Sequence, residues 1–304
     1  MAHHHAPRDA SRGNRVRIAI ALAITLTVLV VEIVGAWLSG SLALLGDAGH
    51  MASDSIGLAV ALVASFVAAR PATDRHTFGF QRMEVLAALA NGLILVVVAV
   101  LVAVEGVRRL VEGVAEIEAG PMLFVAAVGL VANVVAFVVL AGGDRTSLNL
   151  RGALLEVFGD MIGSVAALSA ALVILMTGFV PADAIASLLI AALILPRAGL
   201  LLRDVVRVLT ESAPRDRDVA EIRAHLRGTE GVVAVHDVHI WNITSGAPVF
   251  TAHVVVDPLV FERGETDRML RELADCLAHH FDVDHSTFQL EPAGHAECEE
   301  HAHR

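Results

Sequence analysis

The sequence predicts a polytopic α-helical membrane protein, a bundle of six spans, that ends in a small α+β domain outside the membrane. Of the 304 residues, 56% are hydrophobic, against roughly 45–50% in soluble domains. The long apolar stretches all end before residue 210, whereas most acidic residues follow it. The chain therefore divides into a membrane half and a soluble half.

Six apolar stretches carry the prediction of six spans. A helix that crosses a bilayer needs about 20 apolar residues, and the stretches that meet this length are 16–38, 42–69, 83–110, 120–141, 152–176 and 182–206. The short connections between them imply antiparallel neighbours in one bundle, a transmembrane domain over 16–208. The opening segment, 1–15, is too charged to be a cleaved signal peptide and is expected to be a disordered cytoplasmic segment.

The distribution of arginine predicts the orientation of the bundle. The arginines outside the spans concentrate before the first span, in the second and fourth loops and after the last span: Arg8, Arg12, Arg15, Arg17, Arg70, Arg75, Arg82, Arg145, Arg151, Arg207, Arg215 and Arg217. Only Arg108 and Arg109, near the outer end of the third span, depart from this pattern. Both termini are therefore expected in the cytoplasm.

The soluble tail reads as helix, strand, strand, helix, strand. The segments in chain order are 216–228, 232–243, 249–256, 265–281 and 286–291, with a Ser245-Gly246 turn between the first two strands. This order over 213–292 predicts a cytoplasmic α+β domain of the ferredoxin-like type, with helices on one face of the sheet. Residues 293–304 are expected to be a disordered tail. The formal net charge of −11 argues against a nucleic-acid partner.

Two pairs of polar side chains fall inside the spans. His50 and Asp54 lie in the second span, and Glu156 and Asp160 in the fifth. A charge within a span costs about 2.5 to 3.5 kcal/mol to insert, so such residues are candidates for function. Residues four apart lie one turn, about 6 Å, apart on the same helix face. Two such faces together would supply one nitrogen and three carboxylates to a divalent metal.

Structural ion pairing is the alternative explanation for these acids. Arginine is nearly absent from the span interiors, so no cation is expected near the four side chains to neutralise them. For three further acids, Asp47, Glu32 and Glu105, a structural role is the expectation.

Several motifs in order resemble the cation diffusion facilitator family, in particular its bacterial zinc-exporting branch. They are LALLGDAGHMASD, HTFGFQRMEVLAALANGL, RGALLEVFGDMIGS, VHDVHIW and HSTFQLEP. The resemblance covers the chain from about residue 16 to 292. It implies a homodimer in the bacterial inner membrane that exports a divalent metal in exchange for protons, with no prosthetic group.

The resemblance assigns the transport site to His50, Asp54, Glu156 and Asp160. Zinc-selective relatives usually have histidine at the position of Glu156. A carboxylate makes the site harder and more anionic, so cobalt, cadmium, manganese or iron are alternatives to zinc.

Further candidate ligands lie outside the spans. Asp74 and His76 stand where some relatives hold a second metal, although a further histidine of that site would fall at Phe80. In the tail, the resemblance places regulatory metal at His236, His253 and the Gln289/Glu291 pair, with His239 and His285 as neighbours. Alternation puts Gln289 and Glu291 on one strand face, whereas His236 and His239 point oppositely unless a bulge intervenes. The alternative is that these are ordinary polar strand residues.

Histidines and one cysteine also occur at the chain ends, in His3–His5 and in HAECEEHAHR. Such tracts can bind metal loosely and concentrate it near the pore, although His3–His5 read equally as a cloning remnant. Cys276 and Cys298 are too few for a disulfide framework and are expected to be cytosolic thiols.

The coupling of metal transport to protons is expected from the closeness of Asp54, Glu156 and Asp160. Three carboxylates in a low-dielectric site cannot all stay ionised without a cation, so an empty site should hold protons. His50 is the expected carrier of the exchanged proton, and metal binding should expel protons. Alternating access then follows from rocking of the bundle.

Two rival functions are a metal-dependent membrane hydrolase and a non-transporting metal sensor. The hydrolase would need an H-E-x-x-H motif, which the sequence lacks. The sensor would need spans that only anchor the tail, which the buried acids argue against.

Overall fold

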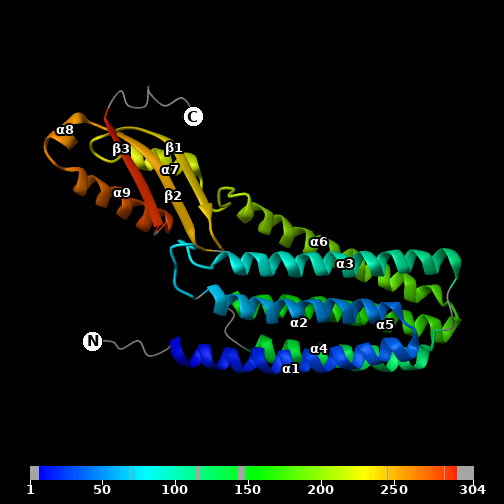
Figure 1. Ribbon diagram of the computed structural model, residues 1–304. Coiled ribbons are helices and arrows are strands. Elements are labelled where there is room, and N and C mark those ends of the chain that lie inside the picture. The colour runs from blue at the N-terminus through cyan, green and yellow to red at the C-terminus, as the bar shows by residue number, and fades with distance from the viewer. Residues whose placement is uncertain are drawn as a thin grey trace. The chain divides into compact units, whose positions relative to one another are not determined.

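The computed structural model describes residues 7–68, 70–113, 117–142, 148–244, 246–283 and 285–292. Six long helices come first (Figure 1): α1 (Pro7–Ser39), α2 (Leu42–Ala68), α3 (Arg82–Glu112), α4 (Ala119–Ala141), α5 (Leu148–Thr177) and α6 (Pro181–Leu209). They coincide with the predicted spans, except that α1 begins earlier, at Pro7. Within the described residues, all except α2 meet the length and apolarity of a membrane-crossing helix.

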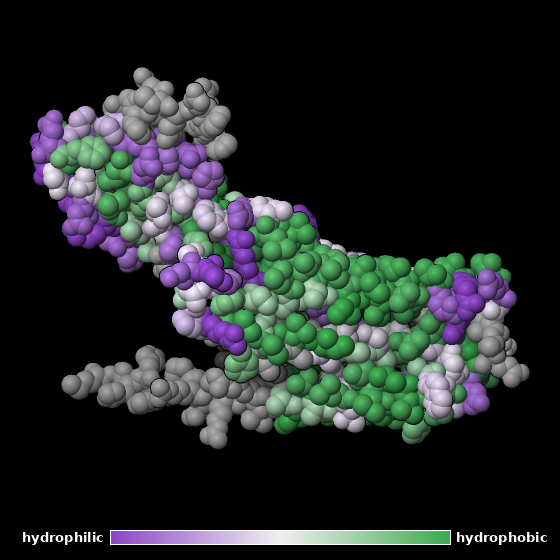
Figure 2. Space-filling model, in the orientation of Figure 1, coloured by the Kyte–Doolittle hydropathy of each residue, from purple (hydrophilic) through white to green (hydrophobic). Residues whose placement is uncertain are grey.

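The surface of the helices has the character of a lipid-facing surface. The face of the helices seen in Figure 2 is largely hydrophobic along their length. Large apolar side chains such as Trp37, Leu101 and Val131 are exposed, at 83%, 63% and 64% respectively. In water such exposure would be unfavourable, whereas in hydrocarbon it is not. The prediction of a helical membrane domain is confirmed.

The helices pack closely through small residues. A Cβ added at Gly35 of α1 would lie 2.5 Å from Val125 of α4, and one at Gly106 of α3 would lie 3.1 Å from Leu188 of α6. Alanines dominate the core around them, as is typical of helix interfaces in membranes.

Asp183, near the start of α6, fixes the start of α2. Its carboxylate is fully buried and accepts hydrogen bonds from the backbone N–H groups of Leu42 and Ala43, at 2.7 and 3.1 Å. It also accepts one from the hydroxyl of Ser41 at 2.5 Å. An anion at a helix N-terminus satisfies otherwise unpaired donors and opposes the helix dipole. This cap holds the helix that carries His50 and Asp54.

The C-terminal domain consists of α7 (Val219–Arg227), β1 (Val232–Asn242), β2 (Pro248–Val256), α8 (Pro258–Glu262), α9 (Thr266–Phe281) and β3 (His285–Pro292). The sheet has the order β1-β2-β3, antiparallel between β1 and β2 and parallel between β2 and β3. The predicted α+β domain is therefore confirmed, with the short α8 added.

The core of this domain lies between the sheet and helices α7 and α9 (Figure 1). Phe250 of β2, Leu226 of α7, and Leu273 and Leu277 of α9 are fully buried there. The β1–β2 connection contains Gly246 at φ 78°, a left-handed conformation that glycine adopts without strain. The other residue of the predicted turn, Ser245, lies outside the described residues.

Candidate functional site

The four intramembrane candidates lie together between α2 and α5. The His50 Nε2 atom is 3.5 Å from Oδ2 of Asp54 and 3.9 Å from Oδ1 of Asp160. The side chains of Asp54 and Glu156 lie within hydrogen-bond reach of each other. His50 therefore lies near an acid of each helix, and each helix contributes an i, i+4 pair. No three of these four side chains bring ligand atoms within 4.8 Å of one another in the described part of the chain.

This cluster is largely shielded from solvent. The side chains of His50 and Asp160 are 8% and 3% exposed, and that of Asp54 is 18% exposed. Within the described part of the chain, His50 Nδ1 and Asp160 Oδ1 are buried without a hydrogen-bond partner. Buried polar atoms without partners destabilise the folded protein, and a metal ion bound by these two atoms would give each of them a partner. The donor set, one nitrogen with carboxylate oxygens, fits a divalent transition metal.

A cavity of about 320 Å³ adjoins the cluster. Asp47, His50, Gly159 and Arg197 are among the residues that line it. Arg197 belongs to α6, and a Cβ added at Gly159 would lie 2.7 Å from its Nη1 atom. The expectation that no cation lies near these acids is therefore wrong. Counting arginines in the loops predicts the orientation of the spans. It does not predict which face of a span an arginine within it occupies, so the position of Arg197 was missed.

The three acids expected to be structural fall into two groups. Glu105 forms ion pairs with Arg108 at 2.7 Å and Arg109 at 3.1 Å near the end of α3, as a structural residue would. Glu32 and Asp47, in contrast, are both almost completely buried. The Asp47 carboxylate accepts a hydrogen bond from Ser164 at 3.5 Å, and it also lines the cavity beside His50.

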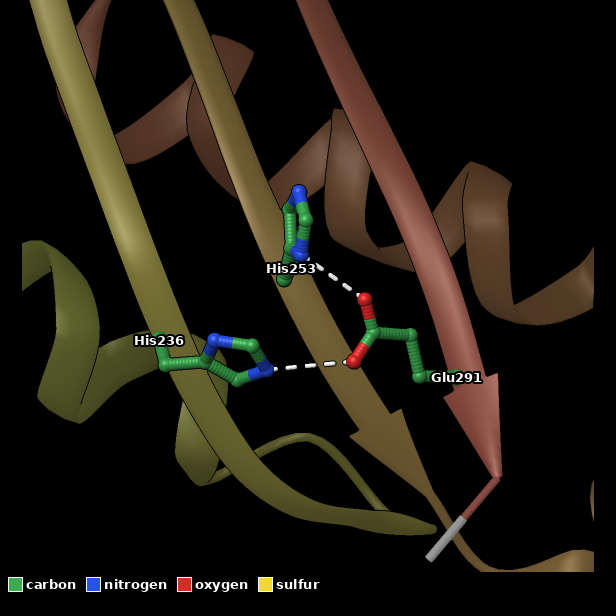
Figure 3. A group of neighbouring side chains, drawn as sticks. All are labelled: His236, His253 and Glu291. Carbon is green, nitrogen blue, oxygen red and sulfur yellow. Dashed lines mark hydrogen bonds and ion pairs between the residues drawn. The ribbon is translucent and has the colours of Figure 1, made fainter. Parts of the chain in front are cut away.

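A second cluster spans all three strands of the cytoplasmic sheet (Figure 3). Glu291 of β3 points toward His236 of β1 and His253 of β2. Its Oε2 is 3.1 Å from His236 Nε2, and its Oε1 is 2.7 Å from His253 Nδ1. One ligand atom from each of the three side chains lies within 4.8 Å of the others. The Glu291 side chain is only 1% exposed, so this group could hold a metal in a partly enclosed site.

The pairing of β1 with β2 shifts register between His236 and His239. Asp237, inside this irregularity, has φ 49°. Its carboxylate lies 3.1 Å from His239 Nε2 and 3.9 Å from His253 Nε2, so it connects His239 to the cluster. Asp237 was not among the predicted ligands, although its place between two candidate histidines in VHDVHIW was the available signal.

Gln289 and His285 are placed differently by β3. Gln289 pairs with His253 in register and donates a hydrogen bond to Oε1 of Glu291 at 2.9 Å, so it supports the cluster. His285 lies six residues before Glu291, roughly 20 Å along the strand. Its ring instead contacts Phe78 edge-on, with centroids 5.5 Å apart.

The remaining candidates do not form a metal cluster among the described residues. Asp74 and His76 are exposed, and the His76 ring stacks on Phe80 at 4.4 Å. Burial raises the pKa of the Cys276 thiol, which favours an inert cysteine. His3–His5 and the 293–304 tail, with Cys298, lie outside the described residues.

Comparison with known proteins covers the whole of this architecture. Residues 18–210 match the family profile described as cation efflux transmembrane domain, and residues 214–293 match that of cation efflux protein, cytoplasmic domain.

Curated relatives match over nearly their full length. The metal cation efflux system protein CzcD of Cupriavidus metallidurans is 41% identical over 96% of this chain and 92% of its own. A cadmium, cobalt and zinc/H(+)-K(+) antiporter of Bacillus subtilis is 39% identical over 88% of this chain and 86% of its own.

A solved metal-bound C-terminal domain of the CzcD transporter from Cupriavidus metallidurans is 43% identical, with a TM-score of 0.22, and covers 25% of this chain and 99% of that one. The chain is thus a multi-pass membrane protein with a cytoplasmic C-terminal domain. It belongs to the cation diffusion facilitator family, and it is a transporter and not an enzyme.

Proposed function

We propose that this protein exports a divalent transition metal, zinc first, from the bacterial cytoplasm across the inner membrane in exchange for protons. The transport site is formed by His50, Asp54, Glu156 and Asp160. The observation that carries the proposal is the position of His50 beside acids of both helices within the helical domain, with its Nε2 3.5 Å from Asp54 and 3.9 Å from Asp160.

Proton exchange follows from competition for the same atoms. Metal binding requires free carboxylates and a neutral imidazole, so a metal arriving from the cytoplasm expels protons. When the site opens to the outside, protons displace the metal. If one proton enters for each metal, one net charge leaves, at a cost of about 2.3 kcal/mol per 100 mV of membrane potential. The chemical proton gradient must cover this cost.

The names of the relatives support the substrate class. One is named for cadmium, cobalt and zinc together with protons and potassium, and another for metal cation efflux. Zinc accepts both nitrogen and carboxylate oxygen ligands in four-coordinate sites. Zinc-selective relatives have histidine at the position of Glu156. The carboxylate favours a wider range of transported metals that includes cobalt and cadmium.

The cytoplasmic cluster serves as a regulatory metal site in this proposal. His236, His253 and Glu291 bind metal when its cytoplasmic level rises, with Asp237, His239 and Gln289 orienting them. Metal bound here would draw two copies of the domain together in a homodimer and so bias the bundle toward transport. Both termini lie in the cytoplasm in this arrangement.

Proteoliposomes with a pH-sensitive dye inside test the transport proposal. Zinc and protons should move in opposite senses, and Asp160→Ala should abolish both movements because it removes a buried ligand. Glu112→Gln provides a matched control, since Glu112 is an exposed residue of α3 whose ion-pair partner among the described residues is exposed Arg108; such pairs contribute little. Zinc movement that continues unchanged in Asp160→Ala would refute the assignment of the site.

A further inference from the structure

Arg197 places a permanent positive charge beside the transport site. It lies 16 residues after the start of α6, and Asp160 lies 17 residues before the end of α5. Because α5 and α6 are consecutive helices joined by a short turn, these positions have nearly the same depth, about 24–26 Å from that turn at 1.5 Å per residue. An arginine at this depth is costly unless it serves a polar site.

The guanidinium lies against α5 one residue before Asp160. A Cβ at Gly159 would lie 2.7 Å from Nη1, so the absence of a side chain at residue 159 lets the cation reach the backbone of α5 directly before Asp160. Arg197 also lines the cavity that His50 and Asp47 line. Its charge acts electrostatically on Asp54, Glu156 and Asp160.

A structural ion pair does not account for this position. Among the described residues, Arg197 forms no ion pair within 4 Å, in contrast to Arg108 and Arg109, which hold Glu105 directly. The charge therefore lies beside the cluster without pairing directly with any one of its carboxylates. Because the site is poorly solvated, the positive charge of Arg197 would repel a divalent metal bound there considerably.

We propose that Arg197 is an internal counter-cation of the transport site, which lowers the affinity for the transported metal and thereby speeds its release. This inference rests on the proposed function. Arg197 is not a metal ligand; it acts on the metal through the electrostatic field at the four ligands. The extra negative charge that Glu156 brings to the site would otherwise hold the metal too tightly for turnover.

Zinc transport by the full-length protein in proteoliposomes tests this at constant pH. Arg197→Gln should lower KM about ten-fold or more, because the repulsion is lost, and it should lower kcat because release slows. Arg197→Lys should stay near the wild type, since it keeps the charge. Arg203→Gln, which neutralises another arginine of α6 outside the cavity lining, should change neither constant.

Equilibrium zinc binding in detergent gives a readout that does not depend on transport. The measurement uses proteins that carry Glu291→Gln, which weakens zinc binding by the cytoplasmic cluster. Adding Arg197→Gln to this background should lower the Kd for zinc about ten-fold or more relative to Glu291→Gln alone. An unchanged or weaker affinity would overturn the role of Arg197. Asp160→Ala separates the two proposals: if it abolishes binding and transport while Arg197→Gln changes nothing, export stands and only this inference fails.

Discussion

Replacing Glu291 by glutamine should remove most of the zinc-induced stabilisation of the cytoplasmic domain. Glu291 holds His236 at 3.1 Å and His253 at 2.7 Å, and it is almost completely buried. Glutamine keeps the shape but loses the anionic ligand. Even an outer-shell substitution costs 10–100-fold in metal affinity, so we expect zinc affinity to fall about 100-fold.

The expected size of the effect follows from linkage. At a free zinc concentration 100 times the wild-type Kd, binding stabilises the folded domain by about 2.7 kcal/mol. For a domain of this size each kcal/mol shifts Tm by about 4–8 °C, so zinc should raise Tm by about 10–20 °C. In Glu291→Gln the same zinc concentration should give about 0.4 kcal/mol, a shift of about 2–3 °C.

Thermal unfolding of the fragment 213–304, followed by circular dichroism with and without zinc, measures these shifts. The fragment is suitable because the domain has its own buried core. Glu262→Gln is the matched control, an exposed carboxylate on α8 outside the cluster, and should respond to zinc like the wild type. A zinc-induced shift in Glu291→Gln as large as in the wild type would show that Glu291 is not a ligand.

Three further outcomes are expected. Glu156→His should narrow the transported metals toward zinc in proteoliposome assays with zinc, cobalt, cadmium, manganese and iron; an unchanged range would show that this position does not set selectivity. Deletion of 213–304 should abolish the dependence of transport on cytoplasmic metal level, as measured by uptake at graded zinc. Asp183→Asn should lower the unfolding free energy by about 1–3 kcal/mol, because it removes the anionic cap of α2; an unchanged Tm in detergent would contradict this.

The sequence predicted the helices and the two i, i+4 pairs inside them because both depend on local periodicity. Long apolar runs mark the membrane-crossing helices without knowledge of packing. The i, i+4 spacing puts His50 beside Asp54, and Glu156 beside Asp160, on any straight helix. Only the meeting of the two faces required tertiary structure, and the structure brings them to within 3.9 Å at His50 and Asp160.

The cytoplasmic cluster was harder to predict because it depends on strand register. Period-two alternation does not reveal the irregularity at Asp237, whose φ of 49° lets its carboxylate reach both His239 and His253. The parallel pairing of β3 with β2 brings Gln289 opposite His253 but leaves His285 at the far end of the strand. Register of this kind is set by the whole sheet and its core.

The place of Arg197 beside the four side chains could not be predicted from the sequence, because the direction in which a helical side chain faces depends on the helices packed around it. With metal bound, which requires ionised carboxylates and a neutral imidazole, the three carboxylates and the Arg197 guanidinium would leave two net negative charges to balance a divalent metal. Glu156→His alone leaves only one net negative charge, so its KM for zinc should rise.

Adding Arg197→Gln to Glu156→His restores two negative charges, so the double variant should recover KM toward the wild type. Kinetics of zinc transport for the wild type, the two single variants and the double variant measure this compensation. A double variant whose KM stays as high as that of Glu156→His would contradict the charge balance argued from the position of Arg197 beside Gly159.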